Sequence, residues 1–508
     1  MQALRPYWLA SLSIIGLIIV RLFVAPSNII NPDCSMFLRA GEILINGGVP
    51  YTDFVELNPP LVFYLHTIPA YFANLSGLSP ETCLYIFTLL LFAFSLFLCW
   101  NLLKDQSEQS AASFGPIIVA FCLGNLICYE WVQFGQRQQL LVNALLPFFV
   151  CRYLRWHDYK TNMLVSIISG LLAGSMICLL PQYAAIVFSL ETFYVWQKRQ
   201  LRPLLAPENI SALVCALAYG LFIWAYEPLK TEFVGRWMPM VNQGYALYNW
   251  PWPMQITQLV VSGILPAITI ALLFILAKKI KLDKQGLFLP IVVFCLGALL
   301  AIVLQGKCIL NQTIPLMYGS LMLGCSVGQN NNFKSTLVAS ITTLLVFLTP
   351  VYLLPGVISQ NQTWQTMTTK IATFINKESN PGDRISVLSL SLPDSYPALP
   401  AAQRQSGNRY FFVFPLLMTD YLEKKNSGKA AAAHWQEESL KFVGDLNSDL
   451  KTNKPRLVLI QENVIPTADI SVRKYLEKTS FWPSLNADYD YTSTIKAGVS
   501  ELSVWKHR

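Results

Sequence analysis

Residues 31–60 of the chain read NPDCSMFLRAGEILINGGVPYTDFVELNPP and lie between two strongly apolar segments. Three acidic residues of this stretch, Asp33, Asp53 and Glu56, stand out because only 13% of the whole chain is charged. Ionisable side chains close to a membrane are costly to desolvate, so they are retained where they serve a function or a tight structural cap. We therefore expect the functional site in this stretch.

The rest of the chain predicts a polytopic membrane protein. It has 508 residues, of which 54% are hydrophobic and clustered in long runs. A membrane-spanning helix needs roughly 20 apolar residues, and this criterion predicts about eleven transmembrane helices. They cover residues 7–25, 80–103, 112–130, 138–154, 162–180, 183–197, 209–226, 254–277, 285–304, 312–328 and 335–355.

The loops between these segments predict the orientation in the membrane. One set of alternate loops is strongly basic and carries Arg5, Lys104, Arg152, Arg155, Lys160, Lys198, Arg199, Arg202, Lys278, Lys279, Lys281, Lys284 and Lys334. The short loops of the other set carry only Arg39, Arg137, Lys230, Arg236 and Lys307. The positive-inside rule places the first set in the cytoplasm. An odd number of spans then places the first outer loop, residues 26–79, and the C-terminal residues 356–508 outside.

Two short helices are predicted within this outer loop. Residues 33–46 have apolar side chains at helical spacing, with charged residues between them, which is typical of a helix lying along the membrane interface. Residues 60–76 are apolar but short, contain Pro69 and end before Gly77. We interpret them as a second, partly immersed helix.

A change in composition after residue 355 predicts a second domain. Residues 384–390 and 456–460 have the pattern of short strands, and residues 420–425 and 430–446 between them look helical. Strands separated by helices indicate a small α/β domain. The predicted fold is therefore an all-α membrane bundle over residues 1–355 followed by an extracytoplasmic α/β domain over 356–508.

The composition also excludes several classes of partner and site. The net charge of +8 is not gathered on a soluble basic face, so no nucleic-acid partner is expected. The eleven cysteines show no CxxC spacing, which supports neither a disulfide framework nor a zinc site. The absence of a glycine-rich phosphate loop or a nucleotide-binding pattern favours a lipid-phosphate substrate over a nucleotide.

Several motifs together resemble the GT-C glycosyltransferase superfamily, and within it protein O-mannosyltransferases, aminoarabinose transferases and Rgt-type galacturonosyltransferases. Three of them lie in the first outer loop: Pro32-Asp33, Tyr51-Thr52-Asp53, and Glu56-Leu57-Asn58-Pro59-Pro60-Leu61. Further on, Phe134-Gly135-Gln136-Arg137-Gln138 is similar to a glycine-glutamine-arginine loop of such proteins, and Gln305-Gly306-Lys307 with Pro315 resembles their late loop. The resemblance extends over roughly residues 1–355 and is specific over 31–80.

This resemblance implies transfer of a sugar from a polyprenyl-phosphate donor to an acceptor on the outer side of the membrane. The acceptor class stays open among glycolipid, lipopolysaccharide, polysaccharide and protein. Asp33 corresponds to the catalytic carboxylate of the family, and Glu56 to an acidic position that helps to hold acceptor or metal. A divalent metal ion stays open, because Cys34 stands where relatives often have a second acidic residue. Relatives with this layout imply a bacterial inner membrane.

The chemistry of such a transfer assigns roles to the outer charged residues. One carboxylate, Asp33, takes the proton of the attacking group, while Asp53 and Glu56 orient the acceptor or a cation. The phosphate leaving group needs cations, for which Lys307, Arg137 and Arg236 are the candidates. Structural alternatives remain: Asp33 equally suits a helix N-cap and Asp53 the shaping of its turn, and the two cations Lys307 and Arg137 suit interfacial snorkelling.

Two other functions fit the same features. A lipid-linked sugar flippase or transporter would use the outer loop as a gate, although the internal repeat common in transporters is not visible. A glycan ligase or polymerase would transfer a diphosphate-linked oligosaccharide instead of a single sugar. Measuring sugar transfer against lipid translocation separates the first alternative, and a monophosphate-linked donor tests the second.

Overall fold

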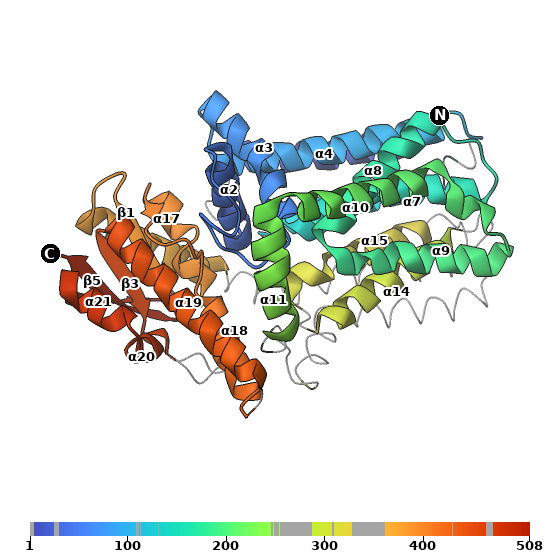
Figure 1. Ribbon diagram of the computed structural model, residues 1–508. Helices are drawn as coiled ribbons and strands as arrows, with labels where there is room; N and C mark the ends of the chain where they lie inside the picture. Colours follow the sequence, from blue (N-terminus) through green and yellow to red (C-terminus); the bar gives the residue numbers. More distant parts are fainter. Residues whose placement is uncertain are drawn as a thin grey trace. The chain divides into compact units, whose positions relative to one another are not determined.

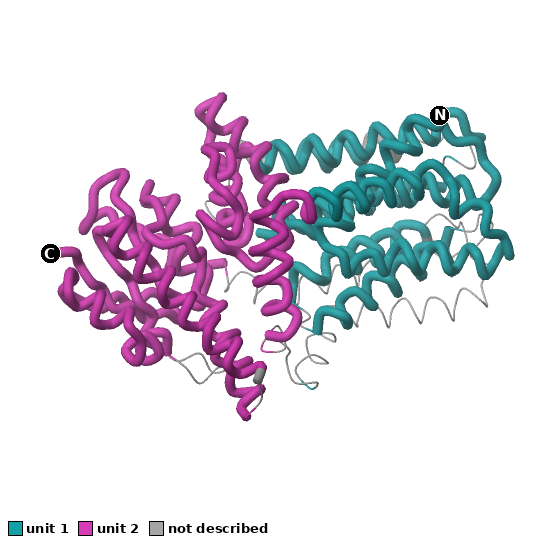
Figure 2. Tube along the Cα trace, in the orientation of Figure 1, with its two compact units in different colours: residues 1–27, 84–222, 250–358 teal, residues 28–83, 223–249, 359–508 magenta. Residues whose placement is uncertain are grey.

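A computed structural model describes the backbone of residues 5–24, 30–107, 111, 113–130, 132–244, 247, 253, 287–306, 309–327, 361–428, 430–463 and 471–508. The chain divides into two compact units (Figure 2). Unit 1 contains residues 1–27, 84–222 and 250–358, and unit 2 contains residues 28–83, 223–249 and 359–508. Unit 2 therefore joins the first outer loop and the C-terminal region, which are far apart in the sequence.

The described part of unit 1 is helical (Figure 1). Its helices are α1 (Arg5–Val24), α4 (Pro80–Leu103), α6 (Gly115–Glu130), α7 (Arg137–Trp156), α8 (Met163–Leu179), α9 (Ala184–Lys198), α10 (Pro207–Ala225), α14 (Phe288–Gln305) and α15 (Ile314–Val327), with the short helical turns η2 (Pro181–Tyr183), η3 (Arg202–Leu205) and η7 (Leu310–Thr313). Each predicted apolar segment within the described residues is a helix. The predicted segments 254–277 and 335–355 lie outside them.

Three described helices, α4, α10 and α14, are long and apolar enough to cross a membrane. Most of α10 is exposed, with apolar residues such as Leu213, Leu217 and Leu221 on its surface. Apolar surface of this kind is suited to contact with lipid. These helices indicate an integral membrane protein, while the number of eleven spans stays a prediction.

Small residues let the helices of unit 1 approach closely. A Cβ atom at Gly174 of α8 would lie 2.6 Å from the carbonyl oxygen of Ala212 on α10. A Cβ atom at Gly297 of α14 would lie 2.6 Å from the Cα atom of Ile186 on α9. Close backbone contact through glycine is a common way to pack helices where lipid weakens the hydrophobic driving force.

An ion cluster is buried between α7, α9 and α10. The guanidinium of Arg152 lies 2.6 Å from the carboxylate of Glu191 and 2.7 Å from that of Glu208, and Arg155 lies 3.3 Å from Glu208. The side chains of Arg152 and Glu208 are almost fully buried, so their charges depend on each other for stabilisation. This cluster is structural, and it accounts for an acidic residue inside an apolar segment.

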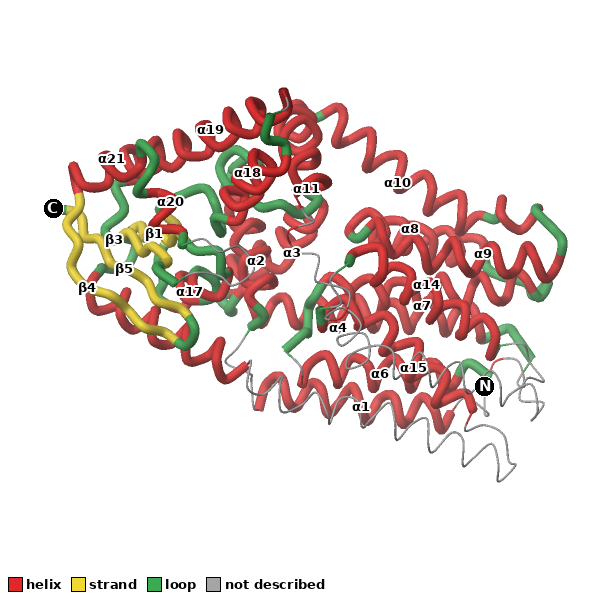
Figure 3. The backbone as a smooth tube through the Cα atoms, turned by 90° about the horizontal axis from the view of Figure 1, so that it is seen from below, coloured by secondary structure: helices red, strands yellow, loops and turns green. Residues whose placement is uncertain are grey.

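Unit 2 contains a five-stranded sheet in the order β2-β1-β3-β5-β4. Strands β1, β3, β4 and β5 are labelled in Figure 3. The strands are β1 (Arg384–Leu388), β2 (Gln405–Ser406), β3 (Leu457–Gln461), β4 (Tyr489–Ala497) and β5 (Ser500–His507). β1 pairs in parallel with β2 and β3, whereas β5 runs antiparallel to β3 and β4. The described helical elements of this region are residues 361–378, η8 (Leu392–Asp394), α17 (Ala398–Ala401), α18 (Phe414–Lys425), α19 (Ala430–Asn453), α20 (Val472–Leu476) and α21 (Phe481–Asp488).

The sheet confirms the predicted strands over 384–390 and 456–460 and extends the prediction. β3 is buried along its whole length, which is why its apolar run is visible in the sequence. The hairpin of β4 and β5 was missed, because β4 exposes most of its residues and carries mainly polar side chains. The predicted domain boundary at residue 355 stays a prediction, since residues 328–360 lie outside the described chain.

The two helices predicted in the first outer loop are present as α2 (Pro32–Ile45) and α3 (Leu61–Ser76). They pack closely, since a Cβ atom at Gly41 would lie 2.5 Å from the carbonyl oxygen of His66. The opposite side of α3 exposes Tyr71, Phe72 and Leu75. This apolar surface suits a helix immersed in the membrane interface, although the interfacial position itself stays a prediction.

Candidate functional site

Asp33 lies in the first turn of α2, at the position predicted from the sequence. Pro32 begins the helix, and the side chain of Asn31 accepts a hydrogen bond from the backbone N–H of Asp33 at 3.0 Å. Asn31 is therefore the N-cap, and the carboxylate of Asp33 is not needed for that purpose. Asp33 is half-buried between residues that are buried, and the helix N-terminus favours its negative charge.

The loop that follows α2 is held in a fixed turn. Gly47 and Tyr51 have φ angles of 86° and 62°, in the left-handed region, which is unusual for tyrosine. The carboxylate of Asp53 accepts a hydrogen bond from the N–H of Val49 at 2.7 Å, and the Tyr51 hydroxyl donates to the carbonyl of Asn58 at 2.5 Å. Asp53 thus shapes its turn, while its side chain stays exposed.

Glu56 is buried, with 3% of its surface exposed. Its carboxylate accepts hydrogen bonds from the backbone N–H of Asn58 at 2.7 Å and from the Asn58 side chain at 2.8 Å. These bonds fix the carboxylate just before the Pro59-Pro60 pair and the start of α3. A carboxylate held in this way is oriented before any ligand arrives, which suits a positioning role.

Backbone hydrogen bonds attach this loop to the C-terminal region within unit 2. The N–H of Val55 donates to the carbonyl of Arg409 at 2.7 Å, and the N–H of Phe411 donates to the carbonyl of Val55 at 3.4 Å. The rings of Phe54 and Phe411 stack with centroids 5.5 Å apart. Residues 54–55 therefore form a short bridge to the C-terminal region, and Asp53 and Glu56 lie on either side of it.

Arg236 joins the second segment of unit 2, residues 223–249, to α19. It lies in the π-helical turn η4 (Leu229–Trp237), and only 8% of its side chain is exposed. Its guanidinium lies 2.6 Å from Glu438, 3.6 Å from Glu232 and 3.7 Å from Asp445. These pairs give Arg236 a structural role, and its predicted contact with the donor phosphate stays a prediction.

Asp445 connects several of these residues. Its carboxylate accepts hydrogen bonds from the Tyr410 hydroxyl at 2.7 Å and from Arg409 at 3.3 Å, in addition to the ion pair with Arg236. Burial, followed by the charge of Asp445, raises the pKa of Tyr410 well above its ordinary value, so this phenol stays a hydrogen-bond donor. Asp445 thus links Tyr410, Arg409 and Arg236 in one network.

In unit 1, Arg137 is the first residue of α7 and is 9% exposed. Gly135 before it has a φ of 85°, and its N–H donates to the side chain of Gln139 at 2.7 Å. Tyr183 lies close enough to sense the charge of Arg137, and its hydroxyl donates to the carbonyl of Gln312 at 2.8 Å. The glycine-glutamine-arginine loop and the late loop thus meet around Tyr183.

The structure groups some of the predicted site residues and separates others. Asp33, Asp53, Glu56 and Arg236 belong to unit 2, whereas Arg137 belongs to unit 1. Lys307 lies outside the described residues. Among the residues that are described, no group of three or more His, Cys, Asp and Glu side chains is arranged to hold a metal ion. Whether the protein binds a divalent metal ion therefore stays open.

Neither a protein-family model nor a curated protein matches the chain. A solved structure does: the crystal structure of ArnT from Cupriavidus metallidurans bound to undecaprenyl phosphate, with a TM-score of 0.51 over 97% of both chains. The chain shares the fold of this ArnT structure. The resemblance predicted over roughly residues 1–355, and most specific over 31–80, is thus confirmed at the level of the fold, while the sequence identity of 11% carries nothing finer.

The residues that hold the site in place were not predicted from the sequence. An Asn-Pro pair before an apolar helical pattern is a helix start signal, so Asn31 could have been predicted as the N-cap. The contacts of Val55 and Asp445 could not be predicted from the sequence, because their partners lie hundreds of residues away or on another segment. Nothing local in the sequence marks a long-range partner of this kind.

Proposed function

We propose that this GT-C protein transfers a sugar from a polyprenyl-phosphate donor to an acceptor on the outer side of the membrane. The observation that supports it best is the fold, which is shared along nearly the whole chain with an ArnT structure that holds undecaprenyl phosphate. The long apolar helices of the bundle suit a substrate that is itself a lipid.

Asp33 is the general base in this proposal. It is part-exposed at the start of α2, where Asn31 makes the capping bond, and the resemblance to GT-C proteins assigns the general-base role to this carboxylate. The base removes a proton from the acceptor as the sugar leaves its phosphate. Glu56 and Asp53 orient the acceptor or an optional cation, since both are fixed in the same loop by hydrogen bonds.

Arg137 and Lys307 hold the donor phosphate. Arg137 stands at a helix N-terminus, where backbone N–H groups also favour an anion, and its planar guanidinium matches phosphate oxygens. Lys307 directly follows Gly306, the C-terminal cap of α14, and belongs to the late loop. Tyr183 contacts this loop at Gln312 and lies near Arg137. Cations at the leaving group stabilise the charge that develops as the bond to the sugar breaks.

The test is Asp33→Asn in proteoliposomes that contain radiolabelled undecaprenyl-phosphate sugars and an outer-envelope acceptor fraction. Loss of a general base lowers the rate by about 10²–10⁴-fold. Asp488→Asn, the same change at an exposed residue at the end of α21, serves as the control. Wild-type transfer by the Asp33 variant, or translocation of the lipid without any transfer by the unaltered protein, would overturn the proposal.

A further inference from the structure

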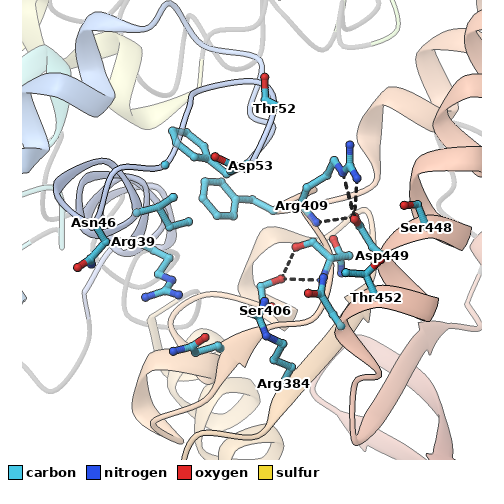
Figure 4. Close-up of a pocket in the computed structure, with 17 residues that line it drawn as sticks. Arg39, Asn46, Thr52, Asp53, Arg384, Ser406, Arg409, Ser448, Asp449 and Thr452 are labelled. Atoms are coloured by element: carbon cyan, nitrogen blue, oxygen red, sulfur yellow. Dashed lines mark hydrogen bonds and ion pairs between the residues drawn. The ribbon is translucent and has the colours of Figure 1, made fainter. Parts of the chain in front are cut away.

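Unit 2 contains a polar pocket of about 730 Å³ (Figure 4). Its walls come from α2, the turn after it, β1, β2 with the residues that follow, and the last turns of α19. The first outer loop and the C-terminal region thus build it together. Of the residues predicted to act in the site, only Asp53 lines it, so most of this pocket has no assigned role.

Arginine side chains dominate the charge of the pocket. Arg39, Arg384 and Arg409 line it, against the two carboxylates Asp53 and Asp449. Arg409 and Asp449 pair with each other at 2.8 Å, and Asp53 is engaged by the N–H of Val49. The lining therefore has a net charge of +1, and Arg384 is its arginine without an ion pair within the described residues.

Neither Arg39 nor Arg384 uses all of its N–H donors. Arg39 makes an ion pair with Glu42, one turn further along α2, at 2.8 Å through one nitrogen. Arg384 makes a single long hydrogen bond of 3.5 Å, to the carbonyl of Ser406, and no ion pair within the described residues. A guanidinium has five N–H donors in a planar fork, which fits the oxygens of a carboxylate or a phosphate.

Neutral hydrogen-bonding groups fill the remainder of the wall. They are the side chains of Asn46, Thr52, Gln405, Ser406, Asn408, Ser448, Thr452 and Asn453. Asn408 is 94% buried and donates to the Ser386 hydroxyl at 2.9 Å, while its Oδ1 has no partner within the described residues. A buried acceptor without a partner is unfavourable, and a ligand hydroxyl at the pocket would satisfy it.

We propose that this pocket binds an anionic saccharide, that is, a hydroxyl-rich ring that carries a carboxylate or a phosphate. The amides and hydroxyls match ring hydroxyls, the arginines match the anion, and the volume lies within the usual range for small-ligand sites. The inference deepens the proposed function by assigning this saccharide to the acceptor. It rests on the proposed function for that assignment alone. Binding itself requires no transfer reaction.

The probes for the test differ at a single carbon. Glucose, glucuronic acid and glucose 6-phosphate are added at millimolar concentration to the full chain in lipid nanodiscs, and binding is measured by saturation-transfer NMR. Glucuronic acid or glucose 6-phosphate should bind at least about tenfold more tightly than glucose, because hydrogen bonds to an ionised group are stronger. The better of the two identifies the anion as carboxylate or phosphate. Equal binding of glucose, no binding of either anionic sugar, or binding of inorganic phosphate as tight as that of both anionic sugars would overturn the proposal.

Variants then place the binding in this pocket. Arg384→Gln should weaken binding of the anionic sugar about tenfold, and Ser448→Trp, on an exposed position of α19, should block it without a change in charge. Arg508→Gln removes an exposed arginine outside the pocket and should leave binding unchanged. Unaltered binding in both pocket variants, with normal melting temperatures, would contradict the assignment.

The same measurements in the Asp33→Asn background separate this inference from the proposed function. If Asp33→Asn abolishes transfer but retains saccharide binding, both hold. If the unaltered protein transfers sugar but binds no anionic saccharide, only the inference fails. If it binds the saccharide but transfers no sugar, only the proposed function fails.

Discussion

Replacing Arg236 with methionine would separate its structural role from its predicted contact with the donor phosphate. In the structure its guanidinium faces three carboxylates, those of Glu232, Glu438 and Asp445, and lies 4.5 Å from the ring of Trp237. Methionine has a similar length but no charge. The variant would remove the ion pair with Glu438, while Asp445 keeps its ion pair with Arg409.

The size of the effect follows from burial. Breaking a fully buried ion pair costs about 3–5 kcal/mol, whereas an exposed pair contributes about 1 kcal/mol or less. Arg236 is 8% exposed but Glu438 and Asp445 are 14% and 20% exposed, which places the loss at about 2–3 kcal/mol. For a unit of roughly 150–250 residues this corresponds to a melting temperature lower by about 5–10 °C.

The assay is thermal unfolding in detergent, followed through tryptophan fluorescence, together with sugar transfer at a temperature where the variant is folded. Glu438→Gln serves as the matched partner variant. The double variant should recover about 1 kcal/mol relative to the sum of the single changes, because the two side chains interact directly. An unchanged melting temperature of Arg236→Met combined with a loss of donor binding would refute the structural reasoning and favour the phosphate contact.

Three further predictions follow from buried groups and backbone bonds. Burial raises the pKa of Asp394 to about 6, so the folded state holds its proton more tightly than the unfolded chain and stability falls by ~3 kcal/mol from about pH 4 to pH 6. In Asp394→Asn, the free energy of unfolding should lose this fall between pH 4 and pH 6. The same dependence on pH in the variant and the unaltered protein would contradict the prediction. Val55→Pro deletes the N–H that donates to Arg409 and should lower the melting temperature and the transfer rate together; normal values for both would show that the bridge is dispensable. Arg152→Met should destabilise unit 1 by about 3–5 kcal/mol, with partial rescue by Glu208→Gln, and failure of the rescue in a thermal assay would argue against direct pairing.

Much of the fold could be predicted because its signals are local. An apolar run long enough to cross a bilayer predicts a helix wherever it occurs, and α4 follows its predicted segment residue for residue. Both helices of the first outer loop begin and end close to the predicted residues, since Pro32 and Gly77 mark boundaries by their own backbone preferences. The β4–β5 hairpin escaped prediction because β4 lies at the edge of the sheet and carries mainly polar side chains.

In the candidate site, too, local features could be predicted from the sequence and long-range contacts could not. The grouping of Asp33, Asp53 and Glu56 after the first apolar helix was visible in the sequence, and so was the resemblance of this stretch to a family of sugar transferases. The partners that hold them were not visible, because hydrogen bonds such as those between Val55 and residues 409–411 join segments separated by more than 350 residues. Their roles in catalysis stay predictions.

The sequence by itself determined that this is a helical membrane protein with acidic residues just after its first apolar helix, because hydropathy and motif spacing are properties of neighbouring residues. Only the tertiary structure decided that Arg236 pairs with α19. It also decided that the first outer loop and the C-terminal region build a polar pocket together. Such pairings depend on which distant segments meet, and chain folding sets that through the sum of many weak contacts.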